Sequence, residues 1–363
     1  MAKDSLEKDT SEKTGNITSR QPVIGGNDLK EERNRDAALR PKYLSEVIGQ
    51  KAVTKRLGIA VKACKKRKEP LGHILFDGPP GLGKTTFATV LPNELGTSIQ
   101  LTSGPALSKP ADLLPFLTNV EENSILFIDE IHRLPRVVEE FIYPAMEDFR
   151  IDIVLGEGLS ARTISMNLKP FTLIGATTRS GMLSSPMRDR FKMHEHLDFY
   201  TIDELSQMIK INAKKLQTPI SDDAARELAC RSRGTPRIAN SRLWWVRNYA
   251  DSEANSSIDL KIAQEALQMA EVSEDGLDKQ DRRYLEVLIQ VFGGGPTGVE
   301  AIAATMNLPA DTLSDEIELY LLREQFIIRS PRGRVATERG FSLFNKKPPK
   351  NGGLTNSGLF GSE

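Results

Sequence analysis

The sequence predicts three folded parts: an α/β domain with a parallel sheet, a small all-α domain, and a winged helix. Short, fully apolar runs alternate with helical segments as far as about residue 199, which is typical of a parallel sheet covered on both faces. After Tyr200 the periodicity is helical only, and the last part has three helices followed by two short strands. The predicted boundaries are 1–36 for a polar, disordered extension, 37–199, 200–272 and 273–345 for the three domains, and 346–363 for a flexible tail.

The overall charge, the cysteines and the length of the apolar runs limit where this protein can act and what it can bind. The chain has 363 residues with 49 basic and 49 acidic side chains, so its overall charge indicates no partner. Cys64 and Cys230 lack metal-ligand spacing, which suits a reducing cytosol. No apolar run approaches the ~18 residues that a membrane-spanning helix needs. We therefore expect a cytoplasmic protein without a membrane span.

The most specific motif follows a short apolar run. Residues 78–85, GPPGLGKT, fit the phosphate-binding P-loop pattern G-x-x-x-x-G-K-[ST]. Glycines such as Gly81 and Gly83 let the backbone fold around an anion, and the following helix adds the positive end of its dipole. Lys84 can reach the β- and γ-phosphates, and the Thr85 hydroxyl can ligate Mg²⁺. A chance Gly/Pro turn is the alternative, but the strand before the motif and the helix after it favour a nucleotide site.

A second apolar run ends in two carboxylates, Asp129 and Glu130. Parallel sheets bind ligands at the carboxyl ends of their strands, which is where this pair would lie. Beside a P-loop, Asp129 is predicted to hold the metal ion and Glu130 to polarise the water that attacks the γ-phosphate. Without the P-loop, the pair would be interpreted as an ordinary solvated strand end.

The other elements of the first domain follow from periodicity and turn residues. Apolar spacing predicts a basic helix over 51–67, and Pro92 is expected to end the helix after the P-loop at Leu91. We further expect helices at 112–120 and 137–148, a hairpin at 149–166 with Gly156–Gly158 at its tip, and a buried strand at 171–176.

Hydroxyl and guanidinium groups late in this domain can complete a nucleotide site. Thr177 and Thr178 end the buried strand, where a hydroxyl can orient the attacking water, although threonines also end strands for structural reasons. Arg188 and Arg190 follow, and an arginine supplied by a neighbouring subunit can accelerate γ-phosphate transfer ~10³–10⁵-fold. A salt-bridged surface arginine is the alternative. Arg237, at a helix start in the all-α domain, can reach the same phosphate or be a solvated charge.

The third part carries the signal for nucleic acid. We expect helices at 281–292, 298–306 and 311–323, then strands near 325–330 and 335–337 joined by a turn at Pro331–Arg334. From Arg323 to Lys350 there are eight basic and two acidic residues, a local net charge of +6. Arg329, Arg332 and Arg334 flank one turn, where they can neutralise backbone phosphates without reading base sequence. A solvated charge cluster is the alternative.

Two further segments have unusual apolar patterns. In the predicted hairpin, Ile151 and Ile153 alternate as a core face does, but Val154 and Leu155 near the tip are harder to bury, which favours a partner-docking surface. In the all-α domain, Trp244–Trp245 can place only one ring in a helix core, because adjacent residues point in different directions.

Several segments together resemble one family. They are ALRPKYLSEVIGQ (38–50), GPPGLGKTT (78–86), TSGPALSKPADL (102–113), LFIDEIHRLPRVVEEFIYPAMEDF (126–149), GATTRSG (175–181), SSPMRDRF (184–191), RGTPRIAN (233–240), FGGGPTG (292–298) and PRGRVAT (331–337). Over residues 37–345 the chain resembles the RuvB family, the bacterial AAA+ motors of Holliday-junction branch migration. The resemblance implies a large AAA+ ATPase domain, a small helical lid and a DNA-binding head. It implies ATP and Mg²⁺ as cofactors, and a hexameric ring on duplex DNA at Holliday junctions. It also implies a RuvA-like junction-binding partner and a RuvC-like resolvase in recombination and repair.

The resemblance also implies roles for individual residues. Near the nucleotide it places Leu39, Arg40, Glu147, Asp148, Phe149 and Tyr200, and at the phosphates and Mg²⁺ it places Lys84, Thr85, Thr86, Asp129 and Glu130. Thr178 becomes the hydroxyl sensor, Arg190 the arginine offered to a neighbouring subunit, with Arg188 as the fallback, and Arg237 the sensor of the lid. Arg329 and Arg334 become DNA contacts, and the hairpin becomes the docking site of the RuvA-like partner.

The chain departs from the family pattern at 192–196, where KMHEH replaces a glycine and an apolar strand, and at 241–245, where SRLWW replaces a basic run. Both departures affect the expected coupling between the first two domains rather than the chemistry.

Two other functions stay open: a nucleotide-gated DNA-binding switch and a clamp-loader-like AAA+ subunit. Glu130 and an arginine acting in trans favour turnover over a switch, and the basic winged helix disfavours a clamp loader.

Overall fold

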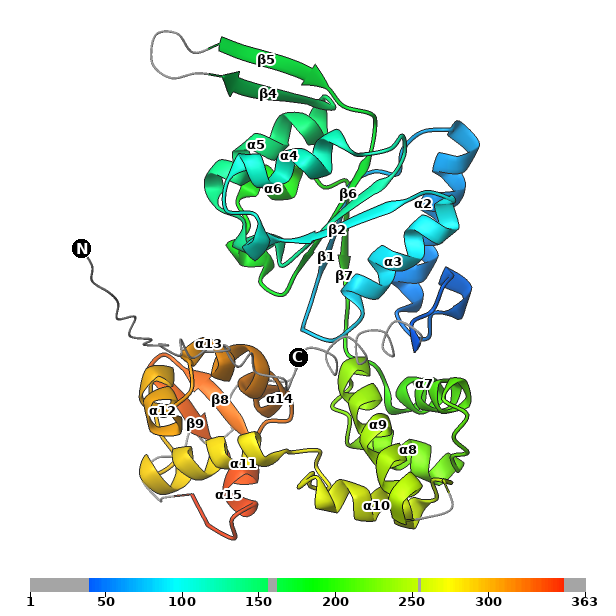
Figure 1. Ribbon diagram of the computed structural model, residues 1–363. Coiled ribbons are helices and arrows are strands. Elements are labelled where there is room, and N and C mark those ends of the chain that lie inside the picture. The colour runs from blue at the N-terminus through cyan, green and yellow to red at the C-terminus, as the bar shows by residue number, and fades with distance from the viewer. Residues whose placement is uncertain (1–38, 156–161, 254–255, 349–363) are drawn as a thin grey trace, which may run out of the picture. The chain divides into compact units, whose positions relative to one another are not determined.

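The computed structural model describes residues 39–155, 162–253 and 256–348 (Figure 1). The α/β domain contains a five-stranded sheet in the order β2-β3-β6-β1-β7, and every neighbouring pair is parallel. Its strands are β1 (Ile74–Asp77), β2 (Ile99–Ser103), β3 (Ile125–Asp129), β6 (Thr172–Thr177) and β7 (Met193–His196). The parallel sheet confirms the predicted fold class and brings the carboxyl ends of β1, β3 and β6 side by side.

The two edge strands were not predicted from the sequence. The three central strands β1, β3 and β6 are apolar runs that lie almost wholly in the interior, and the sequence identified all three. β2 and β7 pair on one side only, and their residues are mostly polar or half exposed. An edge strand needs less apolar surface than a central one, so it lacks the continuous apolar run that marks a buried strand.

Helices cover both faces of this sheet. α2 (Lys51–Arg67) and α3 (Lys84–Leu95) lie on one face, and α4 (Pro110–Thr118), α5 (Arg136–Glu147) and α6 (Ser185–Asp189) lie on the other (Figure 1). The prediction that α3 ends before Pro92 is wrong, because the helix runs on to Leu95. Pro92 stands in the last turns, where its missing N–H removes a single bond, and the Pro92 carbonyl accepts the N–H of Gly96 that closes the helix.

The predicted hairpin is confirmed as a separate antiparallel pair of strands. β4 (Arg150–Leu155) pairs with β5 (Arg162–Asn167), and Ile153 lies opposite Ile164. Ile151 is fully buried, as a core face requires, whereas Ile164 is 50% exposed. The tip, with Gly156–Gly158, lies outside the described residues.

The all-α domain contains α7 (Ile202–Lys215), α8 (Asp222–Cys230), α9 (Pro236–Glu253) and α10 (Leu260–Met269). Its first helix begins with the reciprocal hydrogen bonds of a capping box between Thr201 and Glu204. The two tryptophans of α9 separate as predicted. Trp245 Nε1 donates to the Ala266 carbonyl at 2.7 Å and packs against the core, and Trp244 is 38% exposed.

The last domain has the predicted three helices and two-stranded wing. Its elements are α11 (Lys279–Glu286) continued by η6 (Val287–Val291), α12 (Val299–Met306), α13 (Ala310–Thr312) continued by η7 (Leu313–Ile317) and α14 (Glu318–Arg323), β8 (Ile327–Ser330), β9 (Gly333–Ala336) and α15 (Glu338–Ser342). One detail is corrected: β9 begins at Gly333, so Arg334 belongs to a strand and not to the turn.

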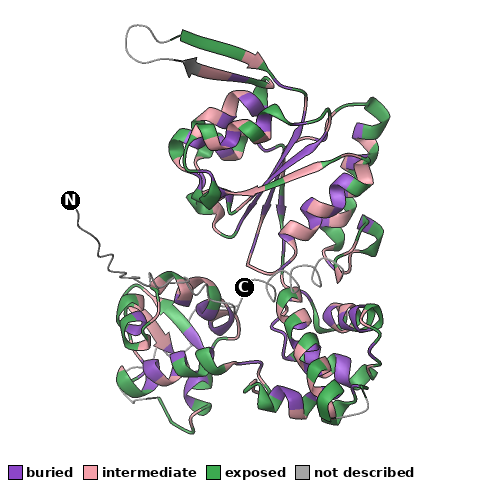
Figure 2. Cartoon of the chain, viewed as in Figure 1, coloured by how far each residue is buried: buried purple, intermediate pink, exposed green. Residues whose placement is uncertain are grey.

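The core follows this organisation (Figure 2). Along β1, Ile74 and Phe76 face one apolar cluster with α2 and α3, while Leu75 faces a second cluster with α4 and α5. The last domain has its own cluster around Tyr284 and Phe326. In Figure 2 the central strands are buried along their length, which leaves their carboxyl ends as the polar edge of the sheet.

Candidate nucleotide and DNA sites

The loop after β1 has a backbone that only glycine can supply. Gly78, Gly81 and Gly83 have φ angles of 131°, 77° and 102°, in the region that side chains disfavour. A Cβ on Gly78 would lie 2.4 Å from the Leu197 carbonyl oxygen, and one on Gly81 would lie 2.7 Å from Thr235. The loop therefore keeps a compact turn whose successive N–H groups suit a phosphate.

Lys84 begins α3 and is buried, with 8% of its surface exposed. Its Nζ donates to the carbonyl oxygens of Gly78 and Pro79, each at 2.7 Å. Burial lowers the pKa of Lys84 to about 8; the Asp129 carboxylate opposes this shift and the Arg237 guanidinium adds to it. A cation held away from water at the mouth of a P-loop attracts anions more strongly than a solvated lysine does.

Thr85 and Asp129 meet at the carboxyl edge of the sheet. The Thr85 hydroxyl lies 3.4 Å from Asp129 Oδ2, and Asp129 Oδ1 accepts the N–H of Glu130 at 2.9 Å. A hydroxyl beside one carboxylate suits Mg²⁺, which takes few protein ligands and keeps waters and substrate phosphates. In the part of the chain that is described, no cluster of three or more His, Cys, Asp and Glu side chains is placed to hold a metal. The Thr85 hydroxyl and the Asp129 carboxylate fit the protein side of a magnesium–nucleotide complex.

Two predicted polar groups flank this pair. Glu130 is half exposed, has φ 48°, and forms an ion pair of 3.1 Å with Arg133. Of the two threonines that end β6, Thr177 is buried and its hydroxyl lies 2.9 Å from His132 Nδ1. Thr178 is exposed at the same edge, next to β1 and β3. Thr178 is therefore the better placed of the two hydroxyls for a ligand.

The all-α domain also contacts the loop. The backbone N–H of Arg237, in the first turn of α9, donates to the Gly81 carbonyl at 3.3 Å. The Tyr200 hydroxyl donates to the Leu82 carbonyl at 3.2 Å, and burial raises the pKa of Tyr200 to about 12. Thr86, one residue beyond Thr85 in α3, is half-buried beside them. These contacts bring residues from α3, from α9 and from the segment between β7 and α7 around one loop.

Arg190 lies at the opposite end of the sheet. It precedes β7, whose first residue Met193 pairs with Ile74 at the start of β1, whereas the P-loop follows the end of β1. Four strand residues separate these ends by about 13 Å. Arg190 forms a 3.1 Å ion pair with Glu147, and its guanidinium stacks 4.0 Å from the ring centroid of Tyr143.

Other residues expected at the nucleotide share this opposite end. The Met146 carbonyl bonds His73, just before β1, so the adjacent Glu147 and Asp148 lie away from the loop of the same chain. The Phe149 ring packs edge-on against Phe171 with centroids 5.9 Å apart. The structure therefore does not bring Glu147, Asp148 and Phe149 to Lys84 within one chain. Arg188 lies in α6 and donates to Ser185 at 3.3 Å. Leu39 and Arg40 precede Pro41, and their predicted role stays a prediction.

The three wing arginines have different surroundings. Arg332 is exposed in the turn between β8 and β9. The side chain of Arg329 is 48% exposed and that of Arg334 only 17% exposed. Both of these arginines bond Glu318 of α14, a residue that the sequence analysis did not select. An acidic residue in an amphipathic helix has no sequence feature that distinguishes a buried partner from a solvated charge.

Comparisons with known proteins agree with this geometry. Residues 39–197 match the Holliday junction DNA helicase RuvB P-loop domain, 200–273 match the RuvB AAA lid domain, and 274–345 match the RuvB C-terminal winged helix domain. The chain belongs to the RuvB family. It is 55% identical over 314 residues, 86% of each chain, to the Holliday junction branch migration complex subunit RuvB of Rhodopirellula baltica.

Solved RuvB structures have the same fold. The Thermotoga maritima RuvB Holliday junction branch migration motor is 45% identical with a TM-score of 0.78, over 86% of this chain and 100% of that one. A single-residue variant of that RuvB is 46% identical with a TM-score of 0.79, over 86% and 99% of the two chains. The RuvB fold therefore extends through all three domains.

The first departure from the RuvB pattern forms a strand stabilised by polar pairs. Glu195 of β7 is 2% exposed and accepts two bonds of 3.0 Å from Arg56 Nε. His196 Nδ1 lies 2.8 Å from Asp77, the last residue of β1. These polar partners take the place of apolar packing, which explains why KMHEH still pairs as an edge strand.

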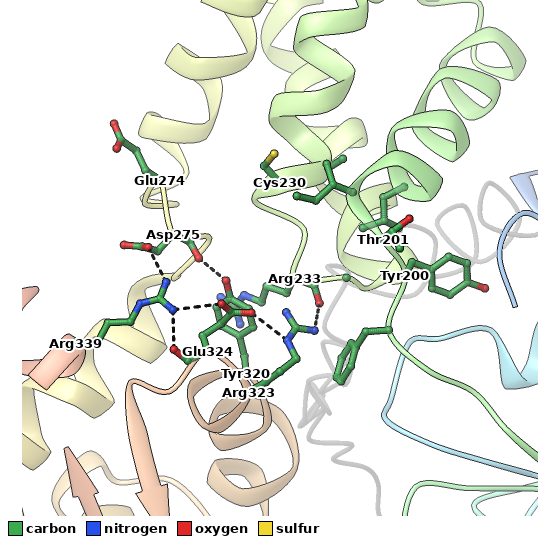
Figure 3. A pocket seen from close by; sticks show the side chains of 15 residues that line it. Tyr200, Thr201, Cys230, Arg233, Glu274, Asp275, Tyr320, Arg323, Glu324 and Arg339 are labelled. Carbon is green, nitrogen blue, oxygen red and sulfur yellow. Dashed lines mark hydrogen bonds and ion pairs between the residues drawn. The ribbon is translucent and has the colours of Figure 1, made fainter. Parts of the chain in front are cut away.

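A cavity of about 390 Å³ lies beside Tyr200 (Figure 3). It is lined by Arg233 of the lid and by Tyr320, Arg323 and Arg339 of the last domain, and not by Lys84 or Asp129. Arg323 Nη1 donates to the Arg233 backbone carbonyl at 3.0 Å, and Figure 3 shows this bond. The cavity therefore shares Tyr200 with the candidate nucleotide site, but none of the P-loop residues 78–85 lines it. Across the described residues, no helix has the length and apolar character needed to cross a membrane.

Proposed function

We propose that this member of the RuvB family is the ATP-driven motor of Holliday-junction branch migration. The observation that carries the proposal is the joint presence of a P-loop with its Thr85–Asp129 pair and a basic wing in one chain of the RuvB family. The relatives named above are a branch migration subunit and a branch migration motor. DNA as the substrate supports a cytoplasmic location, which is part of this proposal.

Apart from an arginine that acts in trans, the nucleotide site of one chain supplies the groups that ATP hydrolysis requires. Lys84 and the N–H groups of the P-loop bind the phosphates, with Thr86 beside them. Thr85 and Asp129 would hold Mg²⁺, which would neutralise charge on the phosphate oxygens when bound. Glu130 accepts the proton of the attacking water, and for this it must leave Arg133, an exchange that costs little because the ion pair is half exposed. Thr178 orients the water.

The residues at the other end of the sheet act on a neighbouring copy. An arginine side chain cannot cover the roughly 13 Å between the ends of β1. Arg190, together with Glu147, Asp148 and the backbone of Phe149, therefore serves the nucleotide of the next subunit. A site shared between copies needs a head-to-tail interface, which forms a ring when its rotation closes, and we propose a homohexamer.

Mixed rings test this arrangement. Arg190→Ala subunits should bind ATP without hydrolysing it, and doping them into parent rings should lower activity more than in proportion to their share. Arg188→Ala is the matched control, because Arg188 lies two residues away and bonds only Ser185 among the contacts described above. Strictly proportional loss with Arg190→Ala, or the stronger poisoning by Arg188→Ala, contradicts the assignment.

The head and hairpin serve the other partners. Arg329, Arg332 and Arg334 contact the backbone of duplex DNA, since a motor that moves along DNA must bind phosphates and not base edges. The exposed Ile164 of the hairpin suits docking of a RuvA-like junction-binding protein, and a RuvC-like resolvase would act on the migrated junction.

A junction assay tests the function as a whole. The parent protein, a RuvA-like partner and ATP should move a synthetic four-way junction, and duplex DNA should stimulate steady-state hydrolysis. Lys84→Ala should lose both activities, because the phosphates lose their buried cation. DNA-stimulated hydrolysis that never moves a junction would instead support the nucleotide-gated switch.

A further inference from the structure

The wing contains a charge arrangement that should be unfavourable by itself. Arg329 of β8 and Arg334 of β9 are direct cross-strand partners. Residues directly opposite each other point to the same face of a two-stranded sheet, and like charges there destabilise the pairing. Something must therefore compensate the repulsion between these two guanidinium groups.

Glu318, the first residue of α14, supplies that compensation from the helix that precedes the wing. Its carboxylate is fully buried. Arg329 donates to Glu318 Oε2 through Nε at 3.1 Å and Nη2 at 2.6 Å. Arg334 donates to Oε1 through Nε at 2.8 Å and to Oε2 through Nη2 at 3.0 Å.

A third group fixes the carboxylate. The Tyr284 hydroxyl, on α11, donates to Glu318 Oε1 at 2.8 Å, and burial together with the nearby carboxylate raises the pKa of Tyr284. Burial alone would raise the pKa of Glu318, but the hydrogen bonds from Arg334 and Arg329 hold it below its usual range. The carboxylate is therefore ionised at neutral pH and bonded from three sides.

The pattern of bonded atoms leaves part of each arginine for another ligand. A guanidinium has five N–H donors, and Glu318 uses only the edge formed by Nε and Nη2. The Nη1 group of each arginine takes no part in these bonds. Because Arg329 is the more exposed of the two, its remaining donors are those that a phosphate in solvent can reach first.

We propose that Glu318 is a positioning residue for DNA binding, which holds Arg329 and Arg334 side by side so that their outer donors grip the phosphate backbone of duplex DNA. The inference rests on the proposed DNA-binding role of the head. Glu318 reduces the net charge of the wing by one, but it also offsets the repulsion between the two arginines. Because it already fixes their side chains, each arginine loses less conformational entropy when DNA binds.

A pair of variants separates positioning from charge. Glu318→Gln and Glu316→Gln remove the same charge from neighbouring positions, but Glu316 is exposed. Charge alone predicts that both variants bind duplex DNA as tightly as the parent or more tightly, since each removes a negative charge near phosphate. Positioning predicts that Glu318→Gln binds about tenfold more weakly, as expected for one lost charge-assisted contact. Its slope of log affinity against log salt should fall by about 0.9, while Glu316→Gln keeps the parent slope.

The measurement is fluorescence anisotropy of labelled duplexes of two unrelated sequences against salt, on the full chain. Glu318→Gln affinity equal to or above that of Glu316→Gln would overturn the inference. If Glu318→Gln does not fold by circular dichroism, Glu318→Asp keeps the charge and withdraws the carboxylate by one methylene. It should also bind more weakly, and parent affinity in that variant contradicts positioning. If Arg329→Ala binds as the parent does, the head's role in DNA binding fails instead.

Discussion

The P-loop and the wing both suit phosphate, but they are built in different ways. At the P-loop, backbone N–H groups and one buried lysine converge, and glycines with positive φ keep the loop in shape. At the wing, long side chains from two strands lie against a buried carboxylate from a helix. One site is made by eight consecutive residues and the other by residues 284, 318, 329 and 334.

This difference determines what a substitution does. At the P-loop the backbone of one segment supplies most of the phosphate donors, so only a few side chains, such as Lys84, are essential there, and Glu130 is added from the end of β3. A side-chain site depends on a network, in which removing one member leaves the others buried and partly unpaired. The predictions below compare these two behaviours, beginning with the largest effect.

Glu130→Gln should lose ATP turnover by about 10²–10⁴-fold, because an amide cannot accept the proton of the attacking water. Affinity for ATP should stay near that of the parent, since Lys84 and the loop are unchanged. Single-turnover hydrolysis and equilibrium nucleotide binding measure the two quantities. Parent-rate hydrolysis by this variant would mean that Glu130 is not the base.

Arg334→Ala should destabilise the head more than Arg329→Ala does. Arg334 is mostly buried against Glu318, and breaking a buried pair costs about 3–5 kcal/mol. We expect about 3 kcal/mol or less, because Arg329 still contacts the carboxylate. Arg329 is 48% exposed, so its removal should weaken DNA binding with a smaller loss of stability.

Hydrogen exchange of residues 327–336 in the full chain measures this difference, with Arg332→Ala as the control for a wing arginine that is exposed in the turn. Equal protection from exchange in the Arg334→Ala and Arg329→Ala variants would mean that the two arginines contribute equally to the stability of the wing.

Sequence reasoning recovered the parts of the molecule that are local. The central strands, the P-loop and the Asp129–Glu130 pair each occupy one short segment with a distinct pattern. Arg329 and Arg334 were found as charges, but their cross-strand register and their shared contact with Glu318 depend on packing across the head. The same limit applies to β7, whose polar residues pair because Arg56 and Asp77 meet Glu195 and His196.

The fold also divides the predicted nucleotide residues into two groups, which lie at opposite ends of the parallel sheet. The family pattern gives Arg190 as the arginine offered to a neighbouring subunit, but it groups Glu147 with Lys84 and does not say that they lie at opposite ends of the sheet. The parallel register of β1 and β7 places Arg190 at the opposite end of the sheet from the P-loop. Spacing along the chain contains no information about that distance.

The smallest expected effect is a difference in pH dependence between the two sites. Lys84 has a pKa lowered to about 8, so it is charged below pH 8 and loses its proton as the pH rises above 8. Affinity for a non-hydrolysable ATP analogue should therefore fall by up to about tenfold per pH unit above 8. Arg334 has a pKa raised from its usual value by the hydrogen bonds to Glu318, so the wing stays charged and duplex DNA affinity should be constant from pH 7.5 to 9.5.

Calorimetry in two buffers of different ionisation enthalpy should show proton uptake on nucleotide binding at pH 9 and little at pH 7.5. Lys84→Arg keeps a cation at every pH tested and should abolish that uptake. Nucleotide affinity that is flat across this range, or that falls equally in Lys84→Arg, would show that the titrating group is not Lys84.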